Sequence, residues 1–160
     1  MDELREMLDH HAIEKILKRY ARALDEKDYD ALDACFTPDA VLDYRAAGGI
    51  RDTYPVVKAW LKDVLDPIPE MQHFTTNVEI AFDGDRATGK SYTLNVNGVR
   101  VNGKLEHMTV GAQYFDELVR TAAGWRITSR REARLCTWGY VFGPEPQVDR
   151  SEERRVGKEC

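Results

Sequence analysis

The sequence predicts an α+β fold in which helices come first and a mainly antiparallel sheet follows. Apolar residues recur with helical spacing in the first part of the chain, whereas from Met71 onward apolar and polar residues alternate as in strands. Turn residues at 83–85 and 123–124 separate successive strands by short connections, which favours antiparallel pairing. We therefore expect three N-terminal helices packed on one face of a curved sheet, enclosing a cone-shaped cavity.

Each predicted helix has its own apolar stripe or capping residue. The first helix is predicted from a stripe at i, i+3, i+4, i+7 and i+11, made of Ile13, Ile16, Leu17, Tyr20 and Leu24. A short second helix, capped by Asp28, ends before Pro38, and a strand over 40–44 follows. The inner face of this second helix is formed by Leu32, Cys35 and Phe36. The third helix has Thr53 near its cap and Pro55 in its first turn.

The strand region contains four longer segments, and the first of them has an irregular alternation. Val78, Ile80 and Phe82 alternate with polar residues, and strands over 86–96, 104–118 and 125–138 follow, with a connection at 98–103. His73 falls on the opposite parity from Val78. Either a bulge lies between them, or His73 precedes the regular ladder.

Composition and charge exclude several classes of protein. A hydrophobic fraction of 42% with 32% charged residues is typical of a globular chain and not of a disordered one. No apolar run approaches the roughly 18 residues of a membrane span. A net charge of −5 provides no basic surface for nucleic acid. The acidic N-terminus lacks the pattern of a secretion signal, so we expect a cytoplasmic protein.

The domain organisation is predicted to be simple, with one domain over residues 1–149. Residues 150–160, RSEERRVGKEC, resemble the translation of an adapter used in short-read DNA sequencing. We therefore interpret this segment as not native and the gene as one assembled from metagenomic reads. The three cysteines have no metal-like spacing, and their odd number argues against a disulfide framework. No pair of histidines has a zinc-like spacing with carboxylates, so we expect no metal site.

Two residues stand out as candidates for proton transfer. Asp25 ends the first predicted helix, where a carboxylate is opposed by the helix dipole, although a solvated helix end is the ordinary explanation. His73 begins the first long strand, and a lone histidine is more often structural than catalytic. Tyr44, Asn95 and Arg134 are further candidates, because Asn95 shares a strand face with small polar residues and Arg134 lies in an apolar stretch.

Taken together, these positions resemble the SnoaL-like family of the nuclear transport factor 2-like superfamily. The resemblance spans roughly residues 10–141, and the matching stretches are 16–25, 33–40, 72–77 and 124–127. It implies a cone of helices around a curved sheet with the active site inside, which agrees with the fold expected from the sequence pattern.

Within that family the chain is similar to three lyases: hexachlorocyclohexane dehydrochlorinase, bile acid 7α-dehydratase and scytalone dehydratase. The resemblance implies that His73 is the catalytic base and Asp25 its orienting carboxylate. It also implies substrate contacts from Tyr20, Tyr44, Asn95 and Arg134, with no cofactor. The dehydrochlorinase has a lysine where this chain has Tyr20, which favours dehydration over dechlorination.

Three functional interpretations follow. The first is a cofactor-free dehydratase acting on a hydroxylated cyclic, steroid-like or polyketide-like small molecule. The second is a dehydrochlorinase, isomerase or cyclase that uses the same base. The third is a non-catalytic module that binds small molecules. An open sheet would expose apolar surface, so we also expect a homo-oligomer, and the resemblance favours a trimer over a dimer.

Overall fold

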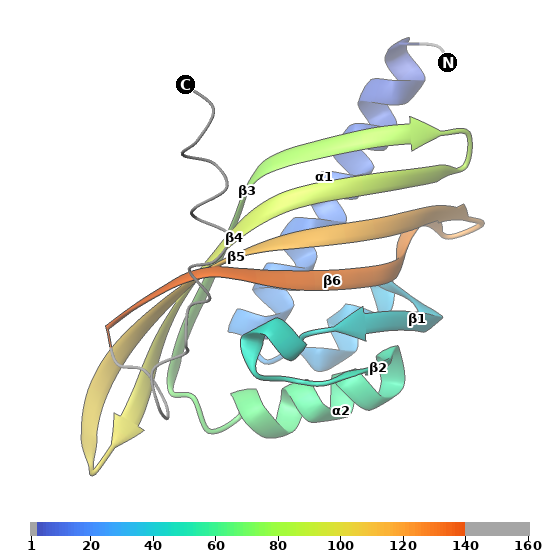
Figure 1. Ribbon diagram of the computed structural model, residues 1–160. Coiled ribbons are helices and arrows are strands. Elements are labelled where there is room, and N and C mark those ends of the chain that lie inside the picture. The colour runs from blue at the N-terminus through green and yellow to red at the C-terminus, as the bar shows by residue number, and fades with distance from the viewer. Residues whose placement is uncertain (1–2, 140–160) are drawn as a thin grey trace, which may run out of the picture.

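A computed structural model of the chain describes residues 3–139, which form helices and one sheet (Figure 1). The N-terminal elements are α1 (Glu3–Asp25), the 3-10 helix η1 (Tyr29–Ala34), β1 (Phe36–Asp43), the 3-10 turn η2 (Arg45–Ala47), β2 (Arg51–Thr53) and α2 (Tyr54–Leu65). The long strands are β3 (Glu70–Asp83), β4 (Arg86–Val101), β5 (Lys104–Thr121) and β6 (Gly124–Gly139). The predicted adapter segment, 150–160, lies outside the described residues.

The six strands form one sheet in the order β2-β1-β6-β5-β4-β3. Every neighbouring pair is antiparallel except β1 and β6, which run parallel. Figure 1 shows the long strands bending strongly, with α1 crossing behind them and α2 running beside β2. The predicted α+β class and curved, mainly antiparallel sheet are therefore confirmed. No helix within residues 3–139 is long and apolar enough to span a bilayer.

The helices pack their predicted apolar residues against the concave face of the sheet. The stripe of α1 is buried, and it joins one core with residues of η1, α2 and the sheet, among them Leu32, Val57, Leu118, Trp125 and Ile127. Thr53 occupies the N-cap of α2 and Pro55 lies in its first turn, as predicted. Because the helices cover this face only in part, a hollow remains between α2 and the far end of the strands.

The second predicted helix is present, but it is shorter than expected and of the 3-10 type. Asp28 caps η1 by accepting a hydrogen bond from the backbone N–H of Ala31. The expectation that Phe36 belongs to this helix is wrong, because Phe36 begins β1. Pro38 does not end the strand. Since proline cannot donate to a ladder, the β1–β6 register instead shifts between Phe36 and Val41.

A bulge in β3 resolves the parity of His73. His73 pairs with Asn95 within the regular ladder, and the register shifts by one residue between Thr76 and Glu79. Asn77 adopts a left-handed conformation there, with φ of 50°. One extra residue reverses the side-chain alternation. His73 and Val78 therefore both face the helices. Of the two predicted alternatives, a bulge is correct, and the position of His73 before the regular ladder is not.

The hairpin between β4 and β5 is longer than the sequence pattern suggested. The predicted connection at 98–103 is wrong, since β4 continues to Val101 and the turn comprises only Asn102 and Gly103. A Cβ atom on Gly98 would lie 2.8 Å from the Glu70 carboxylate. Glycine at this position leaves room for the Glu70 side chain and does not mark a turn.

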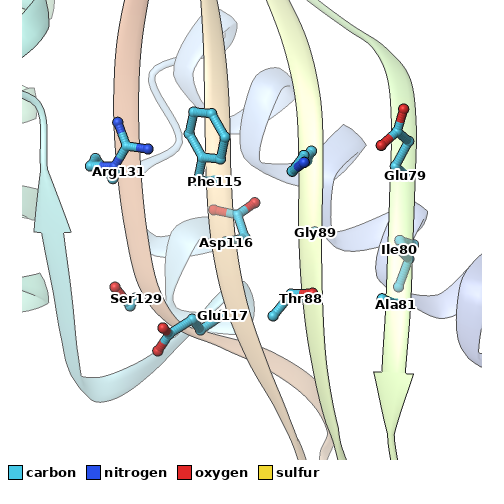
Figure 2. Close-up of a pocket in the computed structure, with 11 residues that line it drawn as sticks. Glu79, Ile80, Ala81, Thr88, Gly89, Phe115, Asp116, Glu117, Ser129 and Arg131 are labelled. Carbon is cyan, nitrogen blue, oxygen red and sulfur yellow. The ribbon is translucent and has the colours of Figure 1, made fainter.

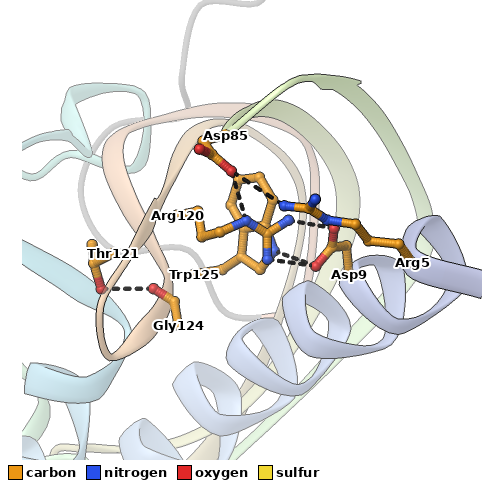
Figure 3. Close-up of polar contacts among 7 residues, drawn as sticks. All are labelled: Arg5, Asp9, Asp85, Arg120, Thr121, Gly124 and Trp125. Carbon is orange, nitrogen blue, oxygen red and sulfur yellow. Dashed lines mark hydrogen bonds and ion pairs between the residues drawn. The ribbon is translucent and has the colours of Figure 1, made fainter. Parts of the chain in front are cut away.

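A polar network fixes the N-terminal half of α1 to the hairpin ends of the sheet (Figure 3). The buried Asp9 accepts hydrogen bonds from Arg120 Nη1 at 2.8 Å and from Trp125 Nε1 at 3.1 Å. Arg120 Nε also donates to Asp85 at 2.8 Å. These contacts hold α1 along the sheet, so that its last residue, Asp25, reaches β3.

Candidate active site

Asp25 and His73 form a tight pair where α1 meets β3. Both carboxylate oxygens of Asp25 accept from the backbone N–H of His73 at 3.0 Å, and Oδ1 lies 2.6 Å from His73 Nδ1. The His73 side chain is 6% exposed and that of Asp25 is 23% exposed. The backbone N–H of His73 holds the Asp25 carboxylate in place, and this carboxylate in turn holds the imidazole ring through Nδ1.

This pairing assigns the tautomer of His73. An ionised carboxylate only accepts hydrogen bonds, so Nδ1 carries the hydrogen and Nε2 is left as a free lone pair. No hydrogen bond to Nε2 comes from any residue in the range 3–139. His73 lines the cavity inside the cone, where a neutral imidazole with a free nitrogen can accept a proton from a bound molecule.

The cavity has a volume of about 330 Å³ and lies between α2, η2 and the concave face of the sheet. One wall is apolar and comes largely from α2, through Trp60, Leu61, Val64 and Leu65. The sheet supplies most of the polar wall. The structure brings five of the six predicted site residues to this lining: Tyr20, Tyr44, His73, Asn95 and Arg134. Asp25 stands behind His73 and does not line the cavity itself.

Tyr20 and Tyr44 meet at the base of the cavity. Their hydroxyl oxygens are 2.8 Å apart, and both side chains are buried. Burial raises the pKa of Tyr20 above its ordinary value, and it raises the pKa of Tyr44 well above its ordinary value. Both phenols therefore stay protonated at neutral pH. One hydroxyl donates to the other, and the second has its hydrogen free for a ligand oxygen.

A buried cation lies beneath this tyrosine pair. The Arg130 guanidinium is 4.3 Å from the ring centres of both Tyr20 and Tyr114. Its Nε and Nη2 each donate to the Asp116 carboxylate at 2.7 Å. The aromatic faces and the carboxylate compensate in part for burying the guanidinium, whose Nη1 has no hydrogen-bond partner among residues 3–139.

Asn95 and Arg134 face the cavity from β4 and β6. The Asn95 side-chain oxygen accepts from Thr93 Oγ1 at 2.8 Å, which leaves the amide hydrogens for a ligand. Arg134 is half-buried, and its Nε has no hydrogen-bond partner among the described residues. Both residues therefore present donors to the interior.

The sequence analysis missed Glu132, a carboxyl group in the cavity wall. Glu132 is 7% exposed. Desolvation raises the pKa of its carboxyl group to about 7, and the positive charges of Arg134 and Arg130 partly offset this rise. A signal was present, because Arg130, Glu132 and Arg134 are spaced two residues apart. Once Arg134 points inward, a strand places the other two on the same face.

A second hollow, of about 690 Å³, lies on the open face of the sheet, away from α1 (Figure 2). Its lining includes Thr88, Phe115, Glu117 and Arg131, and none of the six predicted site residues. No cluster of three or more metal-ligating side chains occurs within residues 3–139. The cavity inside the cone, in contrast, is lined by five of the six predicted site residues.

Comparison with known proteins agrees with this architecture. Residues 5–131 match the family described as SnoaL-like domain. The uncharacterized protein Rv2910c of Mycobacterium tuberculosis is 39% identical over 129 residues, which cover 81% of this chain and 87% of that protein.

Solved structures of low sequence identity share the fold. Hexachlorocyclohexane dehydrochlorinase LinA-type3 from Novosphingobium barchaimii superposes with a TM-score of 0.76 at 18% identity, covering 89% of this chain and 99% of that one. A candidate scytalone dehydratase from Novosphingobium aromaticivorans has a TM-score of 0.74 at 22% identity, with 86% and 91% covered. At these identities the likeness shows the fold alone. The family match over residues 5–131 shows that the chain belongs to the SnoaL-like domain family.

Proposed function

We propose that this chain is a cofactor-free lyase, and specifically a dehydratase that removes water from a hydroxylated cyclic compound in the cytoplasm. The observation that carries the proposal is the Asp25–His73 pair, which leaves Nε2 free at the wall of a cavity lined by Tyr20 and Tyr44. A base, its orienting carboxylate and hydrogen-bond donors are the groups that proton abstraction beside a carbonyl requires.

In the proposed reaction, His73 Nε2 takes a proton from the carbon next to a substrate carbonyl. The Asp25 carboxylate stabilises the imidazolium that forms, because it accepts from Nδ1 at 2.6 Å. The electron pair of the broken C–H bond moves toward the carbonyl oxygen, where the hydroxyl hydrogen that the Tyr20–Tyr44 pair leaves free donates to the developing negative charge. The double bond then forms as the hydroxyl group leaves.

The cavity supports a ring-containing substrate of modest size. Its volume of about 330 Å³ lies at the lower end of the range usual for small-molecule sites. Its apolar wall on α2 suits the face of a carbocyclic ring, and Asn95 and Arg134 can orient oxygen atoms on the opposite edge. Steroid-like and polyketide-like compounds share this combination of apolar faces and a few oxygens.

Two alternatives use the same residues. A dehydrochlorinase, isomerase or cyclase would begin with the same proton abstraction, and it would differ in the leaving group or in the fate of the enolate. A non-catalytic binding module would need no base. The unpaired Nε2 and the open cavity favour an enzyme over the module, because a purely structural histidine normally has both nitrogens satisfied.

The open face of the sheet supports the predicted oligomer. Phe74, Tyr92, Leu94 and Trp138 are exposed aromatic or aliphatic residues of β3, β4 and β6, and Trp138 is 56% exposed. A contiguous apolar surface of this kind is usually covered by a partner. We propose a homo-oligomer, with a trimer preferred over a dimer, and light scattering coupled to size-exclusion chromatography measures its mass. A monomer at micromolar concentration contradicts this part of the proposal.

The activity is tested with a panel of cyclic β-hydroxy ketones, hydroxysteroid derivatives and chlorinated rings, with products read by mass spectrometry. Wild type is compared with His73→Ala and with the control His107→Ala, which changes an exposed histidine of β5. We expect loss of water in wild type and His107→Ala, and no turnover in His73→Ala. Equal turnover in all three proteins would exclude His73 as the base.

A further inference from the structure

An elimination that releases water needs two proton transfers, and the proposed function assigns only one of them. His73 removes the proton from carbon. Hydroxide is a poor leaving group, however, and enzymes that expel it usually protonate it as the C–O bond breaks. Tyr20 and Tyr44 are engaged with each other and lie at the carbonyl end of the proposed reaction. The protein therefore needs a second acid elsewhere in the cavity.

Glu132 is the carboxyl group whose position fits this need. It lines the cavity from β6, where it pairs across the ladder with Tyr114. Strands β5 and β4 separate β6 from β3, which carries His73. Through the ladders His73 lies level with Val110 and Glu132 with Tyr114, so the two residues are four positions apart along β5 as well as three strands apart across the sheet. Their backbones would be roughly 20 Å apart on a flat sheet, and the curvature turns both side chains into the same cavity. A ring substrate between them can contact both.

The surroundings of Glu132 leave its carboxyl available. It is 7% exposed, and no hydrogen bond to it comes from any residue in the range 3–139. A buried carboxyl without a partner is rare, because desolvation of a polar group is costly unless a hydrogen bond compensates it. A buried carboxyl group of this kind is typical of a site where a bound ligand supplies the missing hydrogen bond.

We propose that Glu132 is the general acid of the reaction and donates its proton to the leaving hydroxyl group. This inference rests on the proposed dehydratase function. His73 Nε2 takes the proton, the C–H bond breaks, and its electron pair moves toward the carbonyl oxygen. The carbon–carbon double bond forms as that electron pair returns. The C–O bond breaks with its electron pair on oxygen, and that oxygen takes the Glu132 proton and leaves as water. The imidazolium and carboxylate then return to their starting states by one proton transfer through solvent.

The electrostatics of the cavity are consistent with this role. Desolvation raises the pKa of Glu132 to about 7, with Arg134 and Arg130 acting in the opposite direction. A substantial fraction of the group is therefore protonated at neutral pH, as a general acid must be. The other titratable or charged groups that face this space are Tyr20, Tyr44, His73, Tyr114, Arg130 and Arg134.

A different role for Glu132, as an anchor for Arg134, makes a different prediction. An anchor would affect every substrate equally, because it would act through the position of the guanidinium. A general acid affects only leaving groups that need a proton. Chloride leaves as an anion without protonation, whereas hydroxide does not.

The test compares the β-hydroxy ketone turned over in the panel with its β-chloro analogue, in wild type and Glu132→Gln. Glutamine keeps the shape but has no acidic proton. We expect kcat/KM for the hydroxy compound to fall at least about 100-fold, while that for the chloro compound changes less than about threefold. Glu117→Gln, at an exposed position on the open face, is the control and leaves both rates unchanged. Equal losses on both compounds, or no loss on either, would overturn the inference.

A second measurement separates this inference from the proposed function. Infrared difference spectra of wild type minus Glu132→Gln report the protonation of this carboxyl without any substrate. A protonated carboxyl band that disappears near pH 7 supports an acid in the cavity. An ionised carboxylate already at pH 5.5 refutes the role of Glu132, whatever the panel shows. Absence of turnover in the wild-type panel, with the titration near pH 7 intact, contradicts the dehydratase and not the buried acid.

Discussion

The replacement Glu132→Gln is expected to stabilise the folded protein at alkaline pH. Burial raises the pKa of Glu132 from 4.5 to about 7, so the folded state binds this proton more tightly than the unfolded state. The stability from this group is fully present below the unfolded pKa of 4.5 and is lost as pH rises through the folded pKa of about 7. Above that pH the wild type carries a buried, ionised carboxylate, which glutamine avoids.

The size of the effect follows from the shift. The difference between about 7 and 4.5 is about 2.5 pKa units. At 1.36 kcal/mol per unit, this corresponds to about 3 kcal/mol of stability lost by the wild type above pH 8. Glu132 is 7% exposed, so solvent screening reduces this value only modestly. The mutant and the wild type should have similar stabilities near pH 4.5, and the gap should widen as pH rises.

Urea unfolding followed by circular dichroism measures the free energy of unfolding at several pH values between 4.5 and 8.5. The matched control is Glu117→Gln, which removes one negative charge from an exposed position of β5. A stability difference between wild type and Glu132→Gln that stays constant over this pH range would refute the reasoning. It would mean that the Glu132 carboxylate is ionised in the folded state throughout.

Three further predictions concern Asp25, Tyr44 and the Asp9 network that holds α1. Asp25→Asn should lower kcat by about 10²–10⁴-fold on the substrate found in the panel, because an amide stabilises the imidazolium poorly; full activity would contradict its orienting role. Tyr44→Phe should lower kcat by about 10–100-fold while circular dichroism stays unchanged, since one donor to the oxyanion is removed; an unaltered rate would exclude that contact. Asp9→Asn should destabilise the fold by about 2 kcal/mol at pH 7, because it loses charged hydrogen bonds to Arg120. The Arg120 hydrogen bond lowers the pKa of Asp9, so this contribution is present above the unfolded pKa of 3.8 and is lost as pH falls through the lower folded value. Denaturation curves at pH 7 and pH 3 measure it, and an equal difference at both pH values would contradict it.

Local patterns were sufficient to predict the order and type of the main elements. The stripe from Ile13 to Leu24, the cap at Thr53 and the alternation from Val78 to Phe82 each reflect interactions between residues close in sequence, and the structure confirms them. The errors concern Phe36, where a strand begins inside the expected helix, and Gly98, where a strand continues through an expected turn. Both depend on contacts with distant strands, which local propensity does not contain.

The candidate site was accessible from the sequence only in part. Asp25, His73, Tyr20, Tyr44, Asn95 and Arg134 were named chiefly through a family resemblance, and their roles remain predictions. Glu132 escaped notice because Arg130, Arg131 and Glu132 are consecutive, so charged residues lie on both faces of β6 and the pattern leaves open which set points inward. Register shifts in the β5–β6 ladder, between Gly111 and Ala112 and between Glu117 and Leu118, determine that choice.

The amino-acid order therefore suffices for the fold class and for naming a histidine and a carboxylate as candidates. The face on which each polar side chain lies is a property of the assembled sheet. One extra residue in a ladder, as at Asn77, moves every following side chain to the other face, and nothing in the local pattern fixes where that residue is inserted. Hydrogen bonding and packing across the whole sheet decide it. For this reason His73 meets Asp25, and Glu132 enters the cavity, only in the folded protein.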